Sequence, residues 1–128
     1  MVPDTTQDLP AEVEDDIDAF LKRYEQLVGA IQDELFRSVA IIGGEDVRSL
    51  APREVAELMA RLGAISSADR FGELVAIRNR IAHIYPHDPD RQSANLNAAY
   101  EAISDLLEVY RAVRLYLEKR LPPSDRQA

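Results

Sequence analysis

The fold is decided by residues 8–44, which read DLPAEVEDDIDAFLKRYEQLVGAIQDELFRSVAIIGG. Apolar side chains recur in this segment at steps of three and four, the period at which residues share one face of an α-helix. These positions are Val13, Ile17, Phe20, Leu21, Tyr24, Leu27, Val28, Ile31, Leu35, Val39 and Ile42. Asp8 and Pro10 are typical of a helix start, and Gly43 with Gly44 is typical of an end. The segment therefore predicts one helix of about thirty residues, about 45 Å long.

Two helices are predicted to follow it. A short one begins at Pro52 and ends at Gly63, because proline suits a first turn and glycine a C-terminus. The next is capped by Ser66 or Ser67 and runs to about Ile84. The apolar faces consist of Val55, Leu58, Met59 and Leu62 in the short helix and of Phe71, Leu74, Val75 and Ile81 in the next one.

The last predicted helix is capped by Asp88 and opened by Pro89. Its apolar stripe consists of Leu96, Tyr100, Ile103, Leu107, Tyr110, Val113 and Leu117, and is broadened by Leu106 and Tyr116. Together the four segments predict an all-α protein, an up-and-down four-helix bundle with a long first helix and a short second one. Residues 11–121 form the single helical domain of this prediction, between disordered ends at residues 1–10 and 122–128.

Composition restricts the function classes. A chain of 128 residues is long enough for one domain with a proper core. It contains no cysteine, which excludes disulfides and thiolate metal sites. The N-terminus is acidic and polar, unlike a signal peptide, and no apolar run reaches the length of a membrane span. We therefore expect a cytoplasmic protein without membrane contact.

The net charge of −8 is concentrated near the N-terminus. Residues 1–36 contain ten acidic and two basic side chains, whereas residues 37–128 contain thirteen of each. An acidic chain binds nucleic acid poorly in general, because such binding depends on neutralised phosphates. Any RNA contact should therefore be local, and the acidic face is either a solvated surface or a contact for a basic partner protein.

The clustered chemistry of the chain lies in residues 78–86, which read RNRIAHIYP. Arg78 is a permanent cation whose forked donors suit a phosphate, and His83 can transfer protons near neutral pH. Tyr85 adds a hydroxyl group. Pro86 disfavours helical geometry at the preceding residue, so His83 is expected in the last helical turn, where the helix dipole favours its charged form.

Helix geometry separates the two principal side chains of this segment. Residues five apart, such as Arg78 and His83, point about 140° apart around one helix axis. Either the helix loosens before Pro86, or a site is assembled from two chains. Alternatively, Arg78 packs its stem and extends its head to water, and His83 serves only as a C-terminal cap.

Arg78, His83 and Tyr85, in the pattern Arg-x4-His-x-Tyr with Asn79 after the arginine, resemble the motif of the HEPN superfamily, and the chain resembles its HepT-like toxins over most of residues 11–121. The resemblance implies a homodimer whose interface joins both motifs. It also implies a metal-independent endoribonuclease without cofactor, with Arg78 and His83 as catalytic residues. Asn79 and Arg80 would orient or bind the RNA.

The resemblance further implies a partner, a minimal nucleotidyltransferase antitoxin that transfers AMP to Tyr85. Chemically this is coherent, because new phosphates beside Arg78 and His83 would occupy the place of an RNA phosphate. Two alternatives remain from the residues themselves. One is a HEPN module that binds a nucleotidyltransferase or a substrate without cleaving RNA, and the other is a helical dimerisation module without chemistry.

Overall fold

The computed structural model describes residues 11–83 and 87–121. The elements are α1 (Ala11–Gly29), the π-helical segment η1 (Ala30–Leu35), α2 (Phe36–Ile42), α3 (Pro52–Leu62), α4 (Ala68–Ile81) and α5 (Pro89–Arg120). The described ranges contain no strand, which confirms the all-α class. In this part of the chain no helix combines the length and apolarity needed to cross a membrane.

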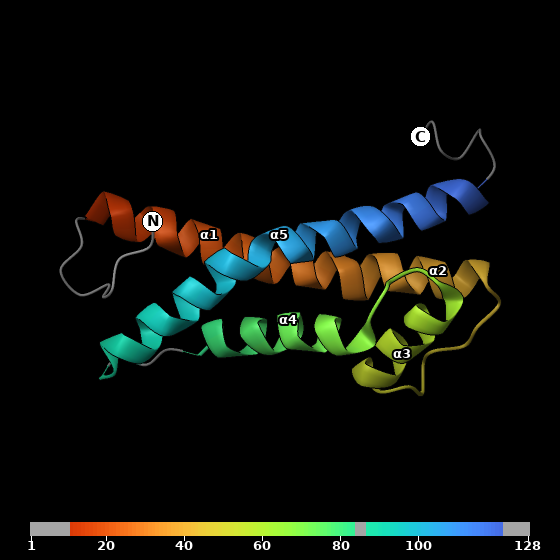
Figure 1. Cartoon of the computed structure of the whole chain (residues 1–128), viewed down its shortest axis with the longest axis horizontal. Helices are drawn as coiled ribbons and strands as arrows, with labels where there is room; N and C mark the ends of the chain where they lie inside the picture. Colours follow the sequence, from red (N-terminus) through yellow and green to blue (C-terminus); the bar gives the residue numbers. More distant parts are fainter. Residues whose placement is uncertain (1–10, 84–86, 122–128) are drawn as a thin grey trace.

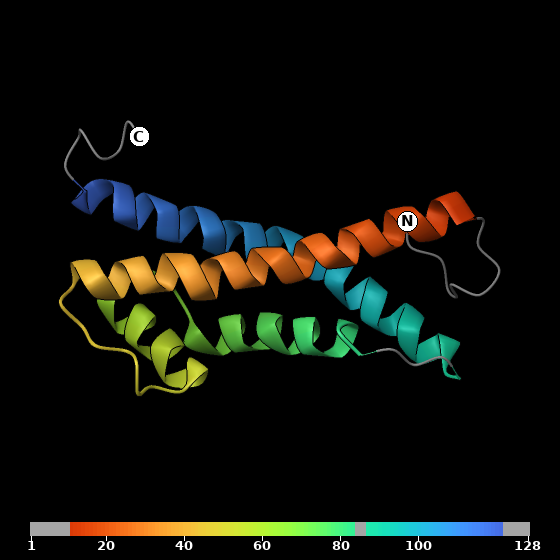
Figure 2. The same cartoon turned by 180° about the vertical axis from the view of Figure 1, so that it is seen from behind.

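Helices α1, η1 and α2 form one continuous helical run along the whole molecule (Figure 1). Helix α4 runs back along it, and α5 then crosses from the end of α4 toward the far end of the run. Seen from behind, α1 and the first half of α5 diverge toward the end of the molecule where α4 stops (Figure 2). Helix α3 packs at the opposite end, against α4 and α2.

The long first helix is confirmed, but its buried face changes register at η1. Tyr24, Val28 and Ile31 are buried at steps of four and three, and the next buried residue, Phe36, follows after a step of five. A π turn accommodates one extra residue, so the inward face continues without a break in the helix. Leu35, predicted in the core, is only half-buried as a result.

The prediction is wrong at both ends of the apolar stripe on this helix, because the first and last side chains of the stripe are exposed. Val13 is 38% exposed and Ile42 is 39% exposed. None of residues 11–23 is buried, because α5 diverges from this part of α1. Ile42 lies in the last turn before Gly43 and Gly44, where the chain leaves the core for the loop to α3.

The core face of α5 is also rotated relative to the prediction. Leu96, Leu106, Val113 and Leu117 are buried as expected, together with Ala99 and Ala102. The predicted core residue Tyr100 is instead 53% exposed. Alanine at 99 and 102 lets the backbone of α5 approach its neighbours closely, so the helix turns its small side chains inward and Tyr100 outward.

The predicted helix ends that lie within residues 11–83 and 87–121 are largely confirmed, whereas the predicted start at Asp8 and Pro10 and the predicted disordered ends at residues 1–10 and 122–128 lie outside the described residues. Ser67 is the cap of α4, with its Oγ accepting a hydrogen bond from the Arg70 N–H at 3.0 Å. Asp88 caps α5 in the same way through the N–H of Arg91, at 3.0 Å. Gly63, which follows α3, has φ +88°, a left-handed conformation that favours glycine.

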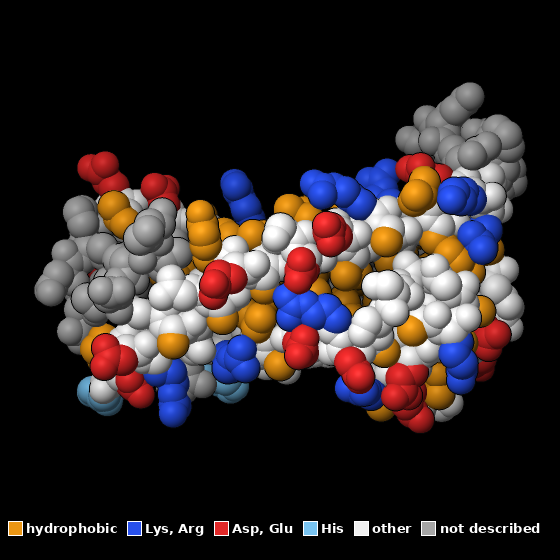
Figure 3. Space-filling model, viewed as in Figure 1, with side chains coloured by type: hydrophobic (Ala, Val, Ile, Leu, Met, Phe, Trp, Pro, Cys, Tyr) orange, Lys and Arg blue, Asp and Glu red, His pale blue; other side chains and the backbone are white. Residues whose placement is uncertain are grey.

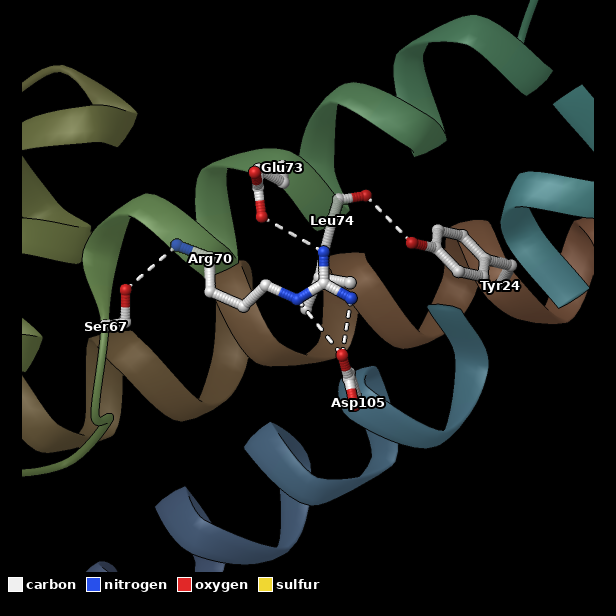
Figure 4. A network of polar contacts seen from close by, with 6 residues as sticks. All are labelled: Tyr24, Ser67, Arg70, Glu73, Leu74 and Asp105. Carbon is white, nitrogen blue, oxygen red and sulfur yellow. Dashed lines mark hydrogen bonds and ion pairs between the residues drawn. The ribbon is translucent and has the colours of Figure 1, made fainter. Parts of the chain in front are cut away.

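Two polar contacts fix α4 against its neighbours (Figure 4). The buried hydroxyl of Tyr24 donates to the Leu74 carbonyl at 2.9 Å. Arg70 donates to Oδ2 of Asp105 on α5, through Nε at 3.1 Å and also through its terminal nitrogen Nη2. The hydrogen bond to Asp105 is the main reason that the pKa of Arg70 is raised, with a smaller contribution from Glu73. Helix α4 is thereby tied to α1 and to α5 before its C-terminal end.

Candidate active site

Helix α4 stops earlier than predicted, at Ile81 and not at about Ile84. The N–H of its C-cap Ala82 bonds to the carbonyls of Arg78 and Arg80, and the His83 N–H bonds to the Arg80 carbonyl at 3.3 Å. These short-range bonds tighten the last turn and end the α-helical ladder. His83 therefore lies just beyond the helix, which corrects the prediction that it occupies the last helical turn.

Arg78 lies at the edge of the apolar face, as its spacing predicts. It is half-buried, one turn after the fully buried Leu74 and three residues before the half-buried Ile81. Its Nε donates to the side-chain oxygen of Asn79 at 2.9 Å. That bond orients the guanidinium group and leaves its terminal nitrogens as further donors for a ligand.

The sequence-predicted site residues divide between two sides of α4. Asn79 lines a hollow of about 250 Å³ between α3 and α4, whereas His83 lines a different cavity between α1, α4 and α5. Arg80 is exposed. Its positive charge favours the ionised form of the Tyr24 hydroxyl on α1 and so partly offsets the rise in pKa that burial causes there. Tyr85 lies outside the described residues. One chain therefore places Asn79 and His83 beside different hollows, although residues four apart would share a face of a continuous helix, because His83 lies beyond the end of α4.

The cavity beside His83 has a volume of about 230 Å³. It opens where α1 and α5 diverge and is lined by Glu14, Ile17, Asp18, Leu21, Ile81, His83, Gln92, Asn95 and Leu96. Its aliphatic side chains form an apolar wall, while its polar groups come from all three helical regions. Carboxylates, amides and an imidazole thus meet around one opening.

Asn95 is the unusual member of this lining. It is 7% exposed, and within the described ranges its side-chain Nδ2 has no hydrogen-bond partner. A buried donor without a partner is unfavourable by about 1–3 kcal/mol. Asn95 therefore weakens the fold unless something else accepts its hydrogen bond.

Sequence reasoning missed this cavity, although a signal was present. The buried positions Ala99, Ala102 and Leu106 define the inward face of α5, and stepping back by four and three from Ala99 gives Asn95 and Gln92. Polar residues at positions where the helix period demands apolar ones indicate a functional or solvated interior.

Comparisons of the chain with protein-family models, with curated proteins and with solved structures found no match. Across residues 11–83 and 87–121, no group of three or more His, Cys, Asp and Glu side chains is placed to hold a metal ion.

A basic surface lies on the second half of α5, along one edge of the molecule (Figure 3). Its cations are Arg111, Arg114, Lys119 and Arg120. The guanidinium carbon of Arg120 lies 3.5 Å from the centroid of the Tyr116 ring, and that of Arg114 lies 5.7 Å from the Tyr110 ring. Stacking limits the motion of these two arginines and leaves their edges for anions. Positive charge therefore gathers at the opposite end of the molecule from the acidic start of α1.

Proposed function

We propose that this chain is a metal-independent endoribonuclease of the HEPN type, built on a HEPN-like helical bundle and active as a homodimer. The observation that carries the proposal is the end of α4. There Arg78 is half-buried and oriented by Asn79, and His83 is exposed beside a polar cavity. An imidazole can transfer the protons, and a fixed cation can stabilise the added negative charge, when RNA is cleaved by its own 2′-hydroxyl.

The reaction assigned to these groups is an internal transesterification. The 2′-oxygen attacks the adjacent phosphorus, the bond to the 5′-oxygen breaks, and the products carry a 2′,3′-cyclic phosphate and a 5′-hydroxyl. One His83 accepts the proton of the 2′-hydroxyl, and a second His83 donates a proton to the leaving oxygen. Arg78 stabilises the additional negative charge on the phosphorus oxygens through its forked donors.

The homodimer is part of this proposal because Asn79, which orients Arg78, and His83 line different hollows of one chain. A twofold pair supplies two copies of Arg78 and of His83 to one cleft. Large apolar side chains remain exposed on both long helical runs: Ile41 on α2 is 69% exposed, and on α5 Tyr100 is 53% and Leu115 52% exposed. Covering this surface with a second copy supports the pairing.

The test is cleavage of single-stranded RNA in the presence of a chelator. We expect His83→Ala to lower the rate by about 100-fold or more, since general acid–base catalysis contributes about 10²–10⁴-fold. The matched control is His87→Ala, which removes the other histidine, itself exposed, only four residues away. Arg78→Lys keeps the positive charge but removes the forked donors of the guanidinium group, so it should also lower the cleavage rate.

Three results would contradict the proposal. They are no cleavage by the wild-type chain, equal cleavage by His83→Ala and wild type, or product ends other than a cyclic phosphate and a 5′-hydroxyl. Light scattering of the purified chain measures its mass, and a monomer would remove the shared cleft.

The proposal includes regulation by a nucleotidyltransferase antitoxin that transfers AMP to Tyr85, a residue that lies outside the described ranges. The added phosphate would compete with RNA for Arg78 and His83. Intact mass after incubation with ATP and such an enzyme should show added AMP on the wild-type chain and none on Tyr85→Phe. An unchanged mass gain in Tyr85→Phe would place the modification elsewhere.

A further inference from the structure

We propose that the basic surface of α5, formed by Arg111, Arg114, Lys119 and Arg120, binds the part of a single-stranded RNA that lies away from the cleaved bond. The choice of RNA rests on the proposed endoribonuclease function, but the surface itself lies outside the site around His83. Three observations carry the inference: unbalanced positive charge, two arginines held against tyrosine rings, and two open hollows beside these cations.

Charge divides α5 into two unlike parts. Residues 89–108 contain one basic and four acidic side chains, whereas residues 109–120 contain four basic side chains and a single acidic one, Glu118. All four cations are exposed, and the ion pairs formed within residues 11–83 and 87–121 use none of them. In a chain with a net charge of −8, this surface therefore offers a polyanion positive charge that the described residues do not neutralise.

Two of the four cations are held in place by tyrosine rings. The guanidinium carbon of Arg120 lies 3.5 Å from the centroid of the Tyr116 ring, and its Nη1 donates to the Tyr116 carbonyl at 3.2 Å. The guanidinium carbon of Arg114 lies 5.7 Å from the Tyr110 ring, and its Nη1 donates to the Tyr110 hydroxyl at 3.2 Å. A guanidinium group fixed in this way can stack its free face on a base and bind a phosphate through its edge.

Two open hollows lie beside these cations. One, of about 410 Å³, is flanked by Tyr110, Arg111 and Arg114. The other, of about 480 Å³, is flanked by Tyr116, Lys119 and Arg120 and is closed on its far side by residues 62–66. Each hollow thus combines an aromatic ring with two cations. This is the composition of surfaces that stack bases and follow the backbone of a single strand, since every nucleotide supplies both a flat ring and a phosphate.

The position of the second hollow sets a minimum length for the RNA. Residues 62–66 lie just before the start of α4, whereas His83 lies beyond its other end. Helix α4 has 14 residues and is therefore about 21 Å long. A strand that reaches both Lys119 and His83 of one chain needs at least about six nucleotides, at about 3.4 Å each when stacked. A dinucleotide bound at His83 would not reach the basic surface.

The experiment measures binding without cleavage, by fluorescence anisotropy over a series of salt concentrations. The probe is a labelled 2′-O-methyl uridine oligonucleotide of about 14 nucleotides, which lacks the attacking hydroxyl group. Lys119→Gln with Arg120→Gln should make the slope of log affinity against log salt shallower by about 1.4, because each phosphate contact on a single strand contributes about 0.7. At about 0.1 M salt this corresponds to binding about 20-fold weaker than that of the wild type.

A second variant tests the stacked geometry separately from the charge. Tyr116→Leu keeps all four cations but removes the ring that holds Arg120. Binding should weaken by about twofold to tenfold, because Arg120 must then be ordered by the RNA, while the salt slope stays that of the wild type. An affinity equal to that of the wild type would contradict the role given to the tyrosine ring.

The matched control is Lys22→Gln with Arg23→Gln. It removes an adjacent lysine and arginine that are equally exposed but lie on α1, outside both hollows. Affinity and salt slope should stay close to those of the wild type. No binding by the wild-type chain, or an equal loss in the two double variants, would overturn the proposal. Equally tight binding of a labelled polyglutamate of the same length would identify a surface for an acidic protein and would also overturn it.

The two proposals fail separately. With an unmodified RNA of the same length, Lys119→Gln with Arg120→Gln should raise KM and leave kcat unchanged, because both residues are remote from His83. If the RNA binds through these two residues but His83→Ala leaves cleavage unchanged, the nuclease assignment fails and the binding surface stands. If cleavage depends on His83 but the double variant binds and cleaves RNA as the wild type does, the surface fails and the nuclease stands.

Discussion

The two ends of the molecule are built differently. At the end formed by α2, α3 and the start of α4, the core is closed by Phe36 and Phe71, whose ring centroids lie 5.0 Å apart, and by the fully buried Met59. At the other end α1 diverges from α5, none of residues 11–23 is buried, and a polar cavity opens beside His83. The closed end contributes packing, and the open end carries the candidate chemistry at a cost in stability.

The largest expected effect tests the closed end. Phe71→Ala should lower the free energy of unfolding by about 3–5 kcal/mol, because it removes a buried ring and leaves a cavity. Leu21→Ala, at a half-buried position of the open end, should cost less than about half as much. Chemical denaturation of both variants measures the contrast, and equal losses would show that the two ends contribute equally.

Tyr24 lies where the closed part of α1 begins, and its pKa makes alkaline stability a second test. Burial raises the pKa of Tyr24 to about 12, an effect partly offset by the charges of Arg70 and Arg80. Because the folded chain holds this proton more tightly than the unfolded chain, the stabilisation is complete below pH 10 and is lost as the pH rises toward 12. The loss should be about 1.4 kcal/mol per pH unit.

Denaturation between neutral pH and pH 12 measures this loss. Tyr24→Phe should flatten the alkaline decline, and at neutral pH it should be about 1 kcal/mol less stable because its bond to Leu74 is gone. Tyr100→Phe, at an exposed site, serves as the control and should keep the wild-type decline. A wild-type decline that Tyr24→Phe reproduces in full would assign it to other groups.

Asn95 offers a test in which a substitution at the open end should increase stability instead of lowering it. Asn95→Leu has similar volume and removes the unpaired donor, so it should raise the free energy of unfolding by about 1–2 kcal/mol. Thermal denaturation monitored by circular dichroism measures the change. Ser93→Ala, which removes the other unsatisfied buried polar group found in the described ranges, should be stabilising by a smaller amount. Lower stability of Asn95→Leu would show that the amide is satisfied in the free protein.

The smallest effect concerns the tie between α4 and α5. Asp105→Asn should cost about 0.5–1 kcal/mol, since the side chains of Arg70 and Asp105 are 42% and 45% exposed and water screens their attraction. Asp46→Asn, which breaks the more exposed loop pair with Arg48, should change stability by less. The difference between the two variants in urea denaturation isolates the contribution of the interhelical contact, and high salt should reduce it.

The helices could be predicted from sequence because each depends on local signals. Pro52, Ser67 and Asp88 mark helix starts, and Gly63 marks an end, through bonds or dihedrals within a few residues. The register change at η1 could not be predicted, since a π turn responds to packing against other helices. The apolar spacing therefore predicts Leu35 in the core and omits Phe36, whereas the structure buries Phe36 and leaves Leu35 half-buried.

The candidate site was predictable only in part, for a similar reason. The Arg78 to His83 segment carries its chemistry in consecutive residues, so residue types alone select it. The cavity joins Glu14, His83 and Asn95, which lie far apart in the chain and meet only through the packing of three helices. The early end of α4 also depends on local backbone hydrogen bonds. Residues 81–83 are Ile, Ala and His, and none of them is a residue type that typically ends a helix.

The π turn in the long helix has a consequence for chain length. Because η1 takes up one surplus residue, deleting a single residue there, such as the half-buried Gln32, would restore an ordinary α-helix with Ile31 and Phe36 four positions apart. A deletion at another point of the same helix would instead rotate everything beyond it by about 100° and turn its apolar face to water. The first helix thus has one place where its length can vary by a residue without disturbing the packing on either side.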